Sequence, residues 1–167
     1  MSLDRLSLAT VPITPFFNET RLPEATGFVW KRHDRFYLIT NWHVASGTHL
    51  FTKTLLLKGG ARPNRFQCHF IVRVGDYGRE RIEIPMRDEN DNPLWLVHPM
   101  QDTGPVDIIA IPLNAVELTK RVTLLPINEL ASGKLANHGR NGRLHSRLSV
   151  WIGAPSVSRV ETREHSV

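Results

Sequence analysis

Short apolar runs separated by polar turns make up most of the chain, and this pattern is typical of β structure. Each run is rich in β-branched or aromatic residues and is bounded by Gly, Pro, Asn or Asp. The pattern predicts strands at Gly27–Lys31, Phe36–Thr40, Thr48–Leu57, Gln67–Val74, Arg81–Met86, Leu94–Val97, Val106–Pro112 and Val122–Ile127. Because there is neither a repeat nor an alternation of strands with helices, the sequence favours an all-β, antiparallel barrel.

The segments between the runs are predicted turns. Lys58–Asn64 and Asp88–Pro93 are polar and rich in Gly, Pro, Asn or Asp, and Asn114–Lys120 has room for one helical turn. The length of 167 residues and a hydrophobic content of 41% allow one domain with a substantial core.

One histidine stands at the end of a predicted strand. The strand Phe36–Thr40 runs into Asn41–Val44 (N-W-H-V) and then a turn of small residues. The preceding strand begins with Gly27, and the polar residues 32–35 can join the two strands. A side chain at the rim of a buried strand is held rigidly and still reaches a ligand. Since an imidazole accepts and returns a proton near neutral pH, His43 is a candidate general base.

A lone carboxylate stands near the start of a second apolar strand. Asp107 follows Gly-Pro and precedes the residues Ile-Ile-Ala-Ile. A carboxylate in such a strand is costly to bury unless it is bonded, although an aspartate in a turn after Gly-Pro is also common.

These two segments resemble the motifs of the trypsin-like serine peptidases of the chymotrypsin fold, G-x-G-F with L-I-T-N-x-H-V, and D-[IVL]-A. Gly27 matches the glycine before the aromatic residue, His43 the base and Asp107 the carboxylate that orients it. This chain has one extra isoleucine before the alanine and a long gap between His43 and Asp107. The resemblance covers about residues 25–127. It implies a Ser-His-Asp triad between two antiparallel barrels, a serine endopeptidase activity and a protein or peptide substrate.

The nucleophile that this resemblance requires is not identifiable. In the family the serine lies in a G-x-S-G-like turn of the second barrel, but of the serines after Asp107 only Ser132 precedes a glycine, and it comes too soon after Asp107. The remaining candidates are Ser146, Ser149, Ser156, Ser158 and Ser166. We therefore expect residues 1–133 to form an essentially complete first barrel that is inactive in peptide hydrolysis, with the second barrel missing or garbled. Without that partner, about residues 1–25 are expected to lack some of their packing surface.

Residues 134–167 form a basic segment with no hydrophobic period. They hold six Lys/Arg against two Asp/Glu, a balance of +4 in a chain of +5. One hypothesis is translation out of frame after a shift between about Gly133 and Asn137. If the same DNA is read one base later, the codons of Trp151-Ile152 must encode glycine. In that frame, permitted codons up to Val167 can spell hydrophobic strands bounded by glycines, which are similar to those of a second barrel.

Other classes of function remain as alternatives. A non-catalytic β-barrel adapter could bind peptides by adding a strand to a sheet edge. The basic segment could bind nucleic acid, but Trp151 is its one aromatic residue and no zinc spacing or phosphate loop accompanies it, so we do not favour this class. The eight histidines lack metal-ligand spacing, and neither a metal nor a cofactor is expected.

The remaining features bear on the compartment. Cys68 is the single cysteine, which excludes an internal disulfide framework, and it is expected to pack as a small hydrophobe. No signal peptide is recognisable, and no apolar run approaches the ~18 residues of a membrane helix. We expect a cytoplasmic protein without a membrane partner. Substrate preference and oligomeric state stay open.

Overall fold

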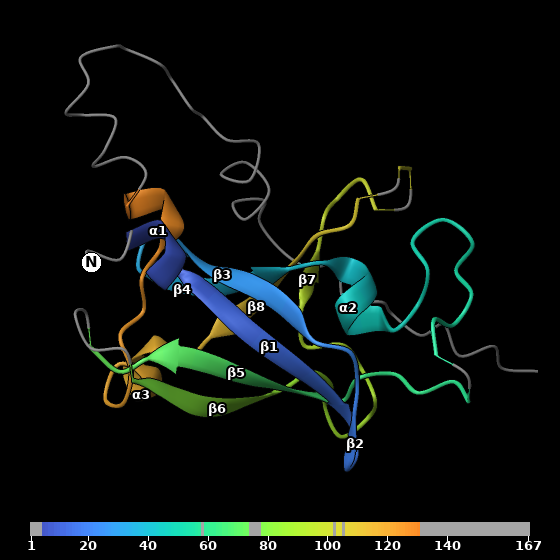
Figure 1. Cartoon of the computed structure of the whole chain (residues 1–167). Coiled ribbons are helices and arrows are strands. Elements are labelled where there is room, and N and C mark those ends of the chain that lie inside the picture. The colour runs from blue at the N-terminus through green and yellow to red at the C-terminus, as the bar shows by residue number, and fades with distance from the viewer. Residues whose placement is uncertain (1–4, 58, 74–77, 102, 105, 131–167) are drawn as a thin grey trace, which may run out of the picture.

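The computed structural model describes residues 5–57, 59–73, 78–101, 103–104 and 106–130. Eight antiparallel strands form one sheet in the order β6-β5-β1-β3-β4-β8-β7, and β2 pairs with β1 (Figure 1). The strands are β1 (Thr10–Phe17), β2 (Thr20–Arg21), β3 (Ala25–Arg32), β4 (Arg35–Thr40), β5 (Arg65–Ile71), β6 (Arg79–Pro85), β7 (Leu96–Val97) and β8 (Ile109–Leu113). Short helices are α1 (Arg5–Leu8), α2 (Trp42–Ser46) and α3 (Ala115–Leu118).

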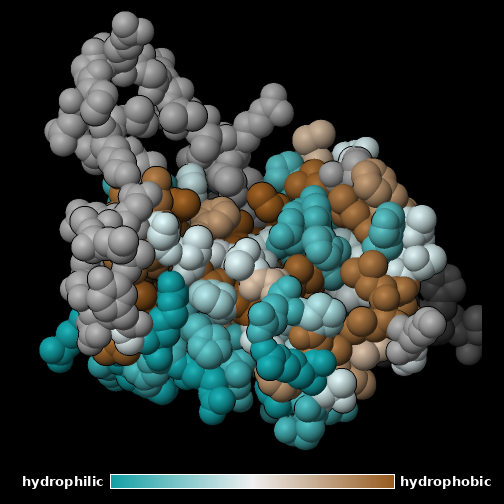
Figure 2. All heavy atoms as spheres, viewed as in Figure 1, coloured by the Kyte–Doolittle hydropathy of each residue, from teal (hydrophilic) through white to brown (hydrophobic). Residues whose placement is uncertain are grey.

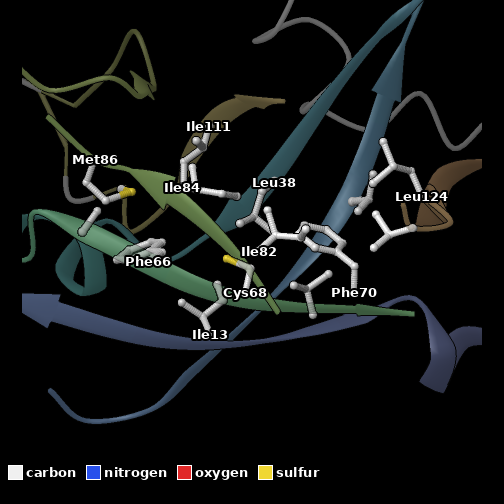
Figure 3. Packing of buried hydrophobic residues seen from close by; sticks show 14 of the residues in the cluster. Ile13, Leu38, Phe66, Cys68, Phe70, Ile82, Ile84, Met86, Ile111 and Leu124 are labelled. Atoms are coloured by element: carbon white, nitrogen blue, oxygen red, sulfur yellow. The ribbon is translucent and has the colours of Figure 1, made fainter. Parts of the chain in front are cut away.

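The sheet curls around the larger of its two hydrophobic clusters. Ile84 of β6 and Ile111 of β8 come from opposite sides of the strand order, yet both belong to this core (Figure 3). The outermost strands β6 and β7 are not paired with each other among the described residues, so the sheet is open. The prediction of an all-β, antiparallel fold is confirmed, and the sheet as described is not a closed barrel.

Cys68 lies in the middle of this core, on β5. It is fully buried between the alternating inward residues Phe66 and Phe70 (Figure 3). Burial disfavours the thiolate and raises the pKa of the Cys68 thiol to about 12. The prediction that this cysteine packs as a small hydrophobe is confirmed.

The N-terminal strand β1 is the main element that the sequence pattern did not predict. It lies between β3 and β5, and Val11 and Ile13 point into the core. The expectation that about residues 1–25 lack packing surface is therefore wrong for β1. Residues 10–13 of β1 pair with β3 and residues 13–16 with β5, so Pro12 and Pro15 each face one neighbouring strand. Two residues without an N–H donor are tolerated because the two pairings are staggered along the strand.

The hairpin of β3 and β4 follows the predicted strands, and its glycine has a steric reason. A Cβ atom on Gly27 would lie 2.6 Å from the backbone oxygen of Ile39 and 3.0 Å from the side chains of Ile13 and Leu38. Only a residue without a side chain fits at this crossing of β1, β3 and β4.

Two predicted strands are wrong. Residues 48–57 form a loop with a single bridge between Thr48 and Leu55, because the chain doubles back at residues 49–54. Residues 122–125 are irregular, Pro126 bridges Val29, and residues 127–130 are helical. The predicted strand Val106–Pro112 begins only at Ile109.

The predicted turns agree better with the structure. Asp88–Pro93 is a turn in which Asp88 accepts hydrogen bonds from the side-chain amide and backbone N–H of Asn92 and from the backbone N–H of Asn90. These bonds, the Asn92 side chain first, hold the pKa of Asp88 below its ordinary value. The expected helical turn is α3, within Asn114–Lys120. In the part of the chain that the structure describes, no helix is long and apolar enough to cross a membrane.

Candidate active site

His43 lies in the first turn of α2, directly after β4. Asn41 precedes the helix in an extended conformation, and Gly47 ends it in the left-handed conformation with φ of 67°. The N–H of Gly47 donates to the carbonyl of His43, which closes the short helix. Where the sequence suggested a plain turn, the structure has the one-turn helix α2 (Figure 1).

Asp107 reaches the same end of the sheet through the register of β4 and β8. Thr40 is the partner of Ile109 in this antiparallel pair. His43 lies three residues beyond Thr40, and Asp107 lies two residues before Ile109, so both leave the sheet at the same place. A slip of this register by one residue would turn every side chain of the strand to the other face and separate the two groups.

The two side chains are joined at two points. Nδ1 of His43 lies 2.7 Å from Oδ2 of Asp107, and the backbone N–H of His43 donates to Oδ1 at 3.0 Å. With Nδ1 as the donor to a carboxylate, the neutral ring carries its lone pair on Nε2. The imidazole side chain is 42% exposed and that of Asp107 is 28% exposed, so the pair is open to a ligand on the side of the ring.

Asn41 is a site residue to which the sequence reading gave no role. Its side chain does not cap α2, although it occupies the N-cap position. Instead, Nδ2 donates to Oδ2 of Asp107 at 3.1 Å and to the backbone oxygen of Asp107 at 3.2 Å. The carboxylate thus accepts bonds from His43 on both oxygens and from Asn41 on one. The signal was present in the sequence, since an asparagine stood two residues before the candidate base.

An apolar hollow of about 140 Å³ lies beside His43. Its lining includes His43 and Val44 of α2, and Leu56 and Leu57 of the loop after α2. The backbone N–H of Leu56 donates to the carbonyl of Gly47 at 2.9 Å, which fixes the loop against the helix.

Exposed apolar residues continue from this hollow over the loop after α2. Phe51, Leu55 and Leu56 are 70%, 45% and 47% exposed. Figure 2 shows brown, hydrophobic atoms on the right, over this loop, while the lower part of the view over β5 and β6 is largely hydrophilic. The surface next to the His43–Asp107 pair is therefore more apolar than the surface over β5 and β6.

The described residues include two serines, and neither is offered to the imidazole. Ser7 lies in α1, which is far from α2 in Figure 1, and the Ser46 hydroxyl is buried and hydrogen-bonded to Thr48 at 2.8 Å. The candidates in the C-terminal part, Ser132, Ser146, Ser149, Ser156, Ser158 and Ser166, lie outside the described residues. Among residues that the structure describes, no group of three His, Cys, Asp or Glu side chains could hold a metal ion.

A scan against protein-family models, a search of curated proteins and a search of solved structures each found no match for this chain. The site is accordingly argued from its own geometry. An imidazole that is oriented by a carboxylate through Nδ1 and exposed toward a hollow is suited to proton transfer.

Proposed function

We propose that this chain carries the first-barrel half of a trypsin-like serine endopeptidase site, with His43 as general base and Asp107 as the group that holds it. The observation that carries the proposal is the attachment of one carboxylate to one histidine through both the ring Nδ1 and the backbone N–H, at 2.7 and 3.0 Å. In this proposal the curled sheet of residues 5–130 is the first barrel of the double-barrel fold.

The chemistry follows from the orientation of the ring. Nε2 of His43 takes the proton of a hydroxyl group as its oxygen attacks a peptide carbonyl, and it later returns the proton to the leaving amine. The positive charge that forms on the ring lies next to Oδ2 of Asp107, which stabilises it. Asn41 keeps the carboxylate turned toward the ring because it binds both its side chain and its backbone oxygen.

The hydroxyl nucleophile is the part that the described residues do not supply. Removal of one member of such a triad typically lowers the rate by several orders of magnitude. We therefore expect this chain to be inactive toward peptide bonds and to retain only the proton-transfer half of the site.

The adapter alternative receives less support from the sheet edges. A peptide that adds a strand needs an accessible edge, and among described residues the edges are β6 and β7. β6 alternates charged residues with buried isoleucines and ends on Pro85, and β7 is two residues long. Charges, proline and short length are features that disfavour strand addition.

Hydrolysis of p-nitrophenyl acetate by the purified chain tests the proposal, because this ester is reactive enough to need no serine. We expect a slow rate that falls to background in His43→Ala and falls severalfold in Asp107→Asn. His49→Ala is the matched control: this exposed histidine accepts a backbone N–H from Thr52 through Nδ1 instead of donating to a carboxylate.

Two results would count against the proposal. An Asp107→Asn variant with the wild-type rate and pH profile would mean that the carboxylate does not assist the imidazole. Hydrolysis of fluorescent casein by the purified chain, abolished by His43→Ala, would mean that the chain contains its own nucleophile and is not an incomplete site.

A further inference from the structure

We propose that the hollow beside His43 is a specificity pocket for an aliphatic side chain of leucine size, adjacent to the bond that the site would cleave. The identity of the occupant rests on the proposed function, since a peptide bound at Nε2 of His43 would place one of its side chains in the hollow. The hollow itself is a feature of the structure. Because His43 is one of its lining residues, a side chain in the hollow lies next to this histidine.

The size of the hollow fits such a side chain. Its volume is about 140 Å³, and a cavity of about 150 Å³ is enough to hold a benzene molecule. A leucine, isoleucine or methionine side chain is of this order, whereas an indole ring is larger. In an extended peptide successive side chains point to opposite sides, so one side chain next to the cleaved bond can enter the hollow while its neighbour points away.

The lining selects for apolar groups. Of the ten residues around the hollow, only Glu24 and His43 carry ionisable side chains. Leu22 is 8% exposed, and the lining also includes Pro23, Val44 and Leu57. A carboxylate would lose water here, which costs free energy. It would also lie near the carboxylate of Glu24, which is ion-paired with Arg21.

The loop after α2, which carries Leu56 and Leu57, is held in place before any ligand binds. Leu56 is bonded to Gly47 through its backbone, and Lys53 lies over the ring of Trp42 with Nζ 4.3 Å from the ring centroid, which attaches the loop to α2 a second time. Gly47 allows this close approach: its φ is positive, and a Cβ atom there would lie 3.2 Å from the carbonyl oxygen of Ala61 and from Pro63. A pocket whose walls are already in place binds without the cost of ordering them.

Titration of the ¹⁵N-labelled chain with blocked amino acids tests this without any catalytic step. We expect N-acetyl-leucinamide to shift the backbone N–H signals of Val44, Gly47, Leu56 and Leu57, with a dissociation constant at least tenfold lower than that of N-acetyl-aspartic acid amide. Leu56→Asp should weaken leucinamide binding at least tenfold. Leu55→Asp is the matched control, since Leu55 has nearly the same exposure, 45% against 47%, but does not line the hollow.

A second variant keeps the test decisive if Leu56→Asp does not fold. Glu24→Gln should narrow the difference in dissociation constant between the two ligands, because it removes a carboxylate from the lining and frees its ion-pair partner Arg21. Equal affinities for the two ligands, or shifts confined to signals away from the hollow, would overturn the pocket. The two proposals can fail separately. If leucinamide binds saturably but the rate of ester hydrolysis is the same in Asp107→Asn as in the wild type, the pocket is supported and the peptidase site is rejected.

Discussion

Asn41 binds the same carboxylate oxygen of Asp107 as the ring of His43, and it also binds the backbone oxygen of Asp107. This asparagine sits at the N-cap of α2 but does not cap it, so its amide serves the carboxylate and not the helix. The candidate base is thus held through a chain of two contacts, from Asn41 to Asp107 and from Asp107 to His43.

Replacement of Asn41 should therefore weaken the site without removing it. A hydrogen bond of this kind contributes about 1 kcal/mol, so we expect Asn41→Ala to lower ester hydrolysis about fivefold. In an Asp107→Asn background the same change should have no further effect, because the two residues act through one contact. Asn114→Ala, at the N-cap of α3, is the control. Additive losses from Asn41→Ala and Asp107→Asn would show that Asn41 acts independently.

Gly27 gives a prediction about stability. A Cβ atom there meets a backbone oxygen at 2.6 Å, which cannot move aside without disturbing the β3–β4 pairing. We expect Gly27→Ala to lower the free energy of unfolding by about 1–3 kcal/mol in urea denaturation. Gly104→Ala should change it little, since the nearest atom to its added Cβ is 3.9 Å away. Equal urea midpoints for Gly27→Ala and Gly104→Ala would contradict the crowding at Gly27.

Cys68 gives a prediction about reactivity and pH. Its thiol is buried and its pKa is raised to about 12, so a thiol-specific disulfide reagent at pH 8 should react only after the chain unfolds. In the unfolded chain the thiol ionises near pH 8.5, as free cysteine does. Between these two pKa values the folded chain keeps the thiol proton and the unfolded chain loses it. The free energy of unfolding should therefore fall as pH rises from about 8.5 toward 12. Cys68→Ala should remove this contribution to the alkaline slope, and rapid labelling of the native chain would contradict the burial.

The hypothesis of a frameshift in residues 134–167 lies outside the described residues, and the coding DNA tests it. We expect the codons for Asn137 to Val167, read one base later, to spell hydrophobic strands bounded by glycines. A gene with the frame restored and extended should then encode a serine in a glycine turn and yield casein hydrolysis that depends on His43. Codons that cannot spell such strands in the shifted frame would reject the hypothesis.

Signals in the sequence predicted the part of the fold around His43 and Asp107. The alternating apolar pattern located β3 and β4 to within two residues. The motif around His43 and the lone Asp107 predicted a contact between groups 64 residues apart. The strands were predictable because alternation appears directly in the sequence. The contact was an implication of the resemblance to the trypsin-like peptidase motifs, since the cost of burying a lone carboxylate does not by itself name its partner.

The missed elements depend on tertiary structure. Pro12 and Pro15 argue against a central strand, and only the staggered pairing of β1 with β3 and β5 makes their positions acceptable. Residues 48–57 have the composition of a strand, but they fold as a loop that packs against α2. The role of Asn41 was also hidden, because an N-cap asparagine is ordinarily explained by its helix.

The distance along the chain between His43 and Asp107 has a consequence for biosynthesis. The histidine leaves the ribosome long before the carboxylate, and the two meet only when β8 docks on β4, one of the late-synthesised, non-local pairings of this sheet. Such contacts form slowly because a long loop must close first. During translation the imidazole of His43 therefore stays without its carboxylate partner until nearly all of the described sheet has been made.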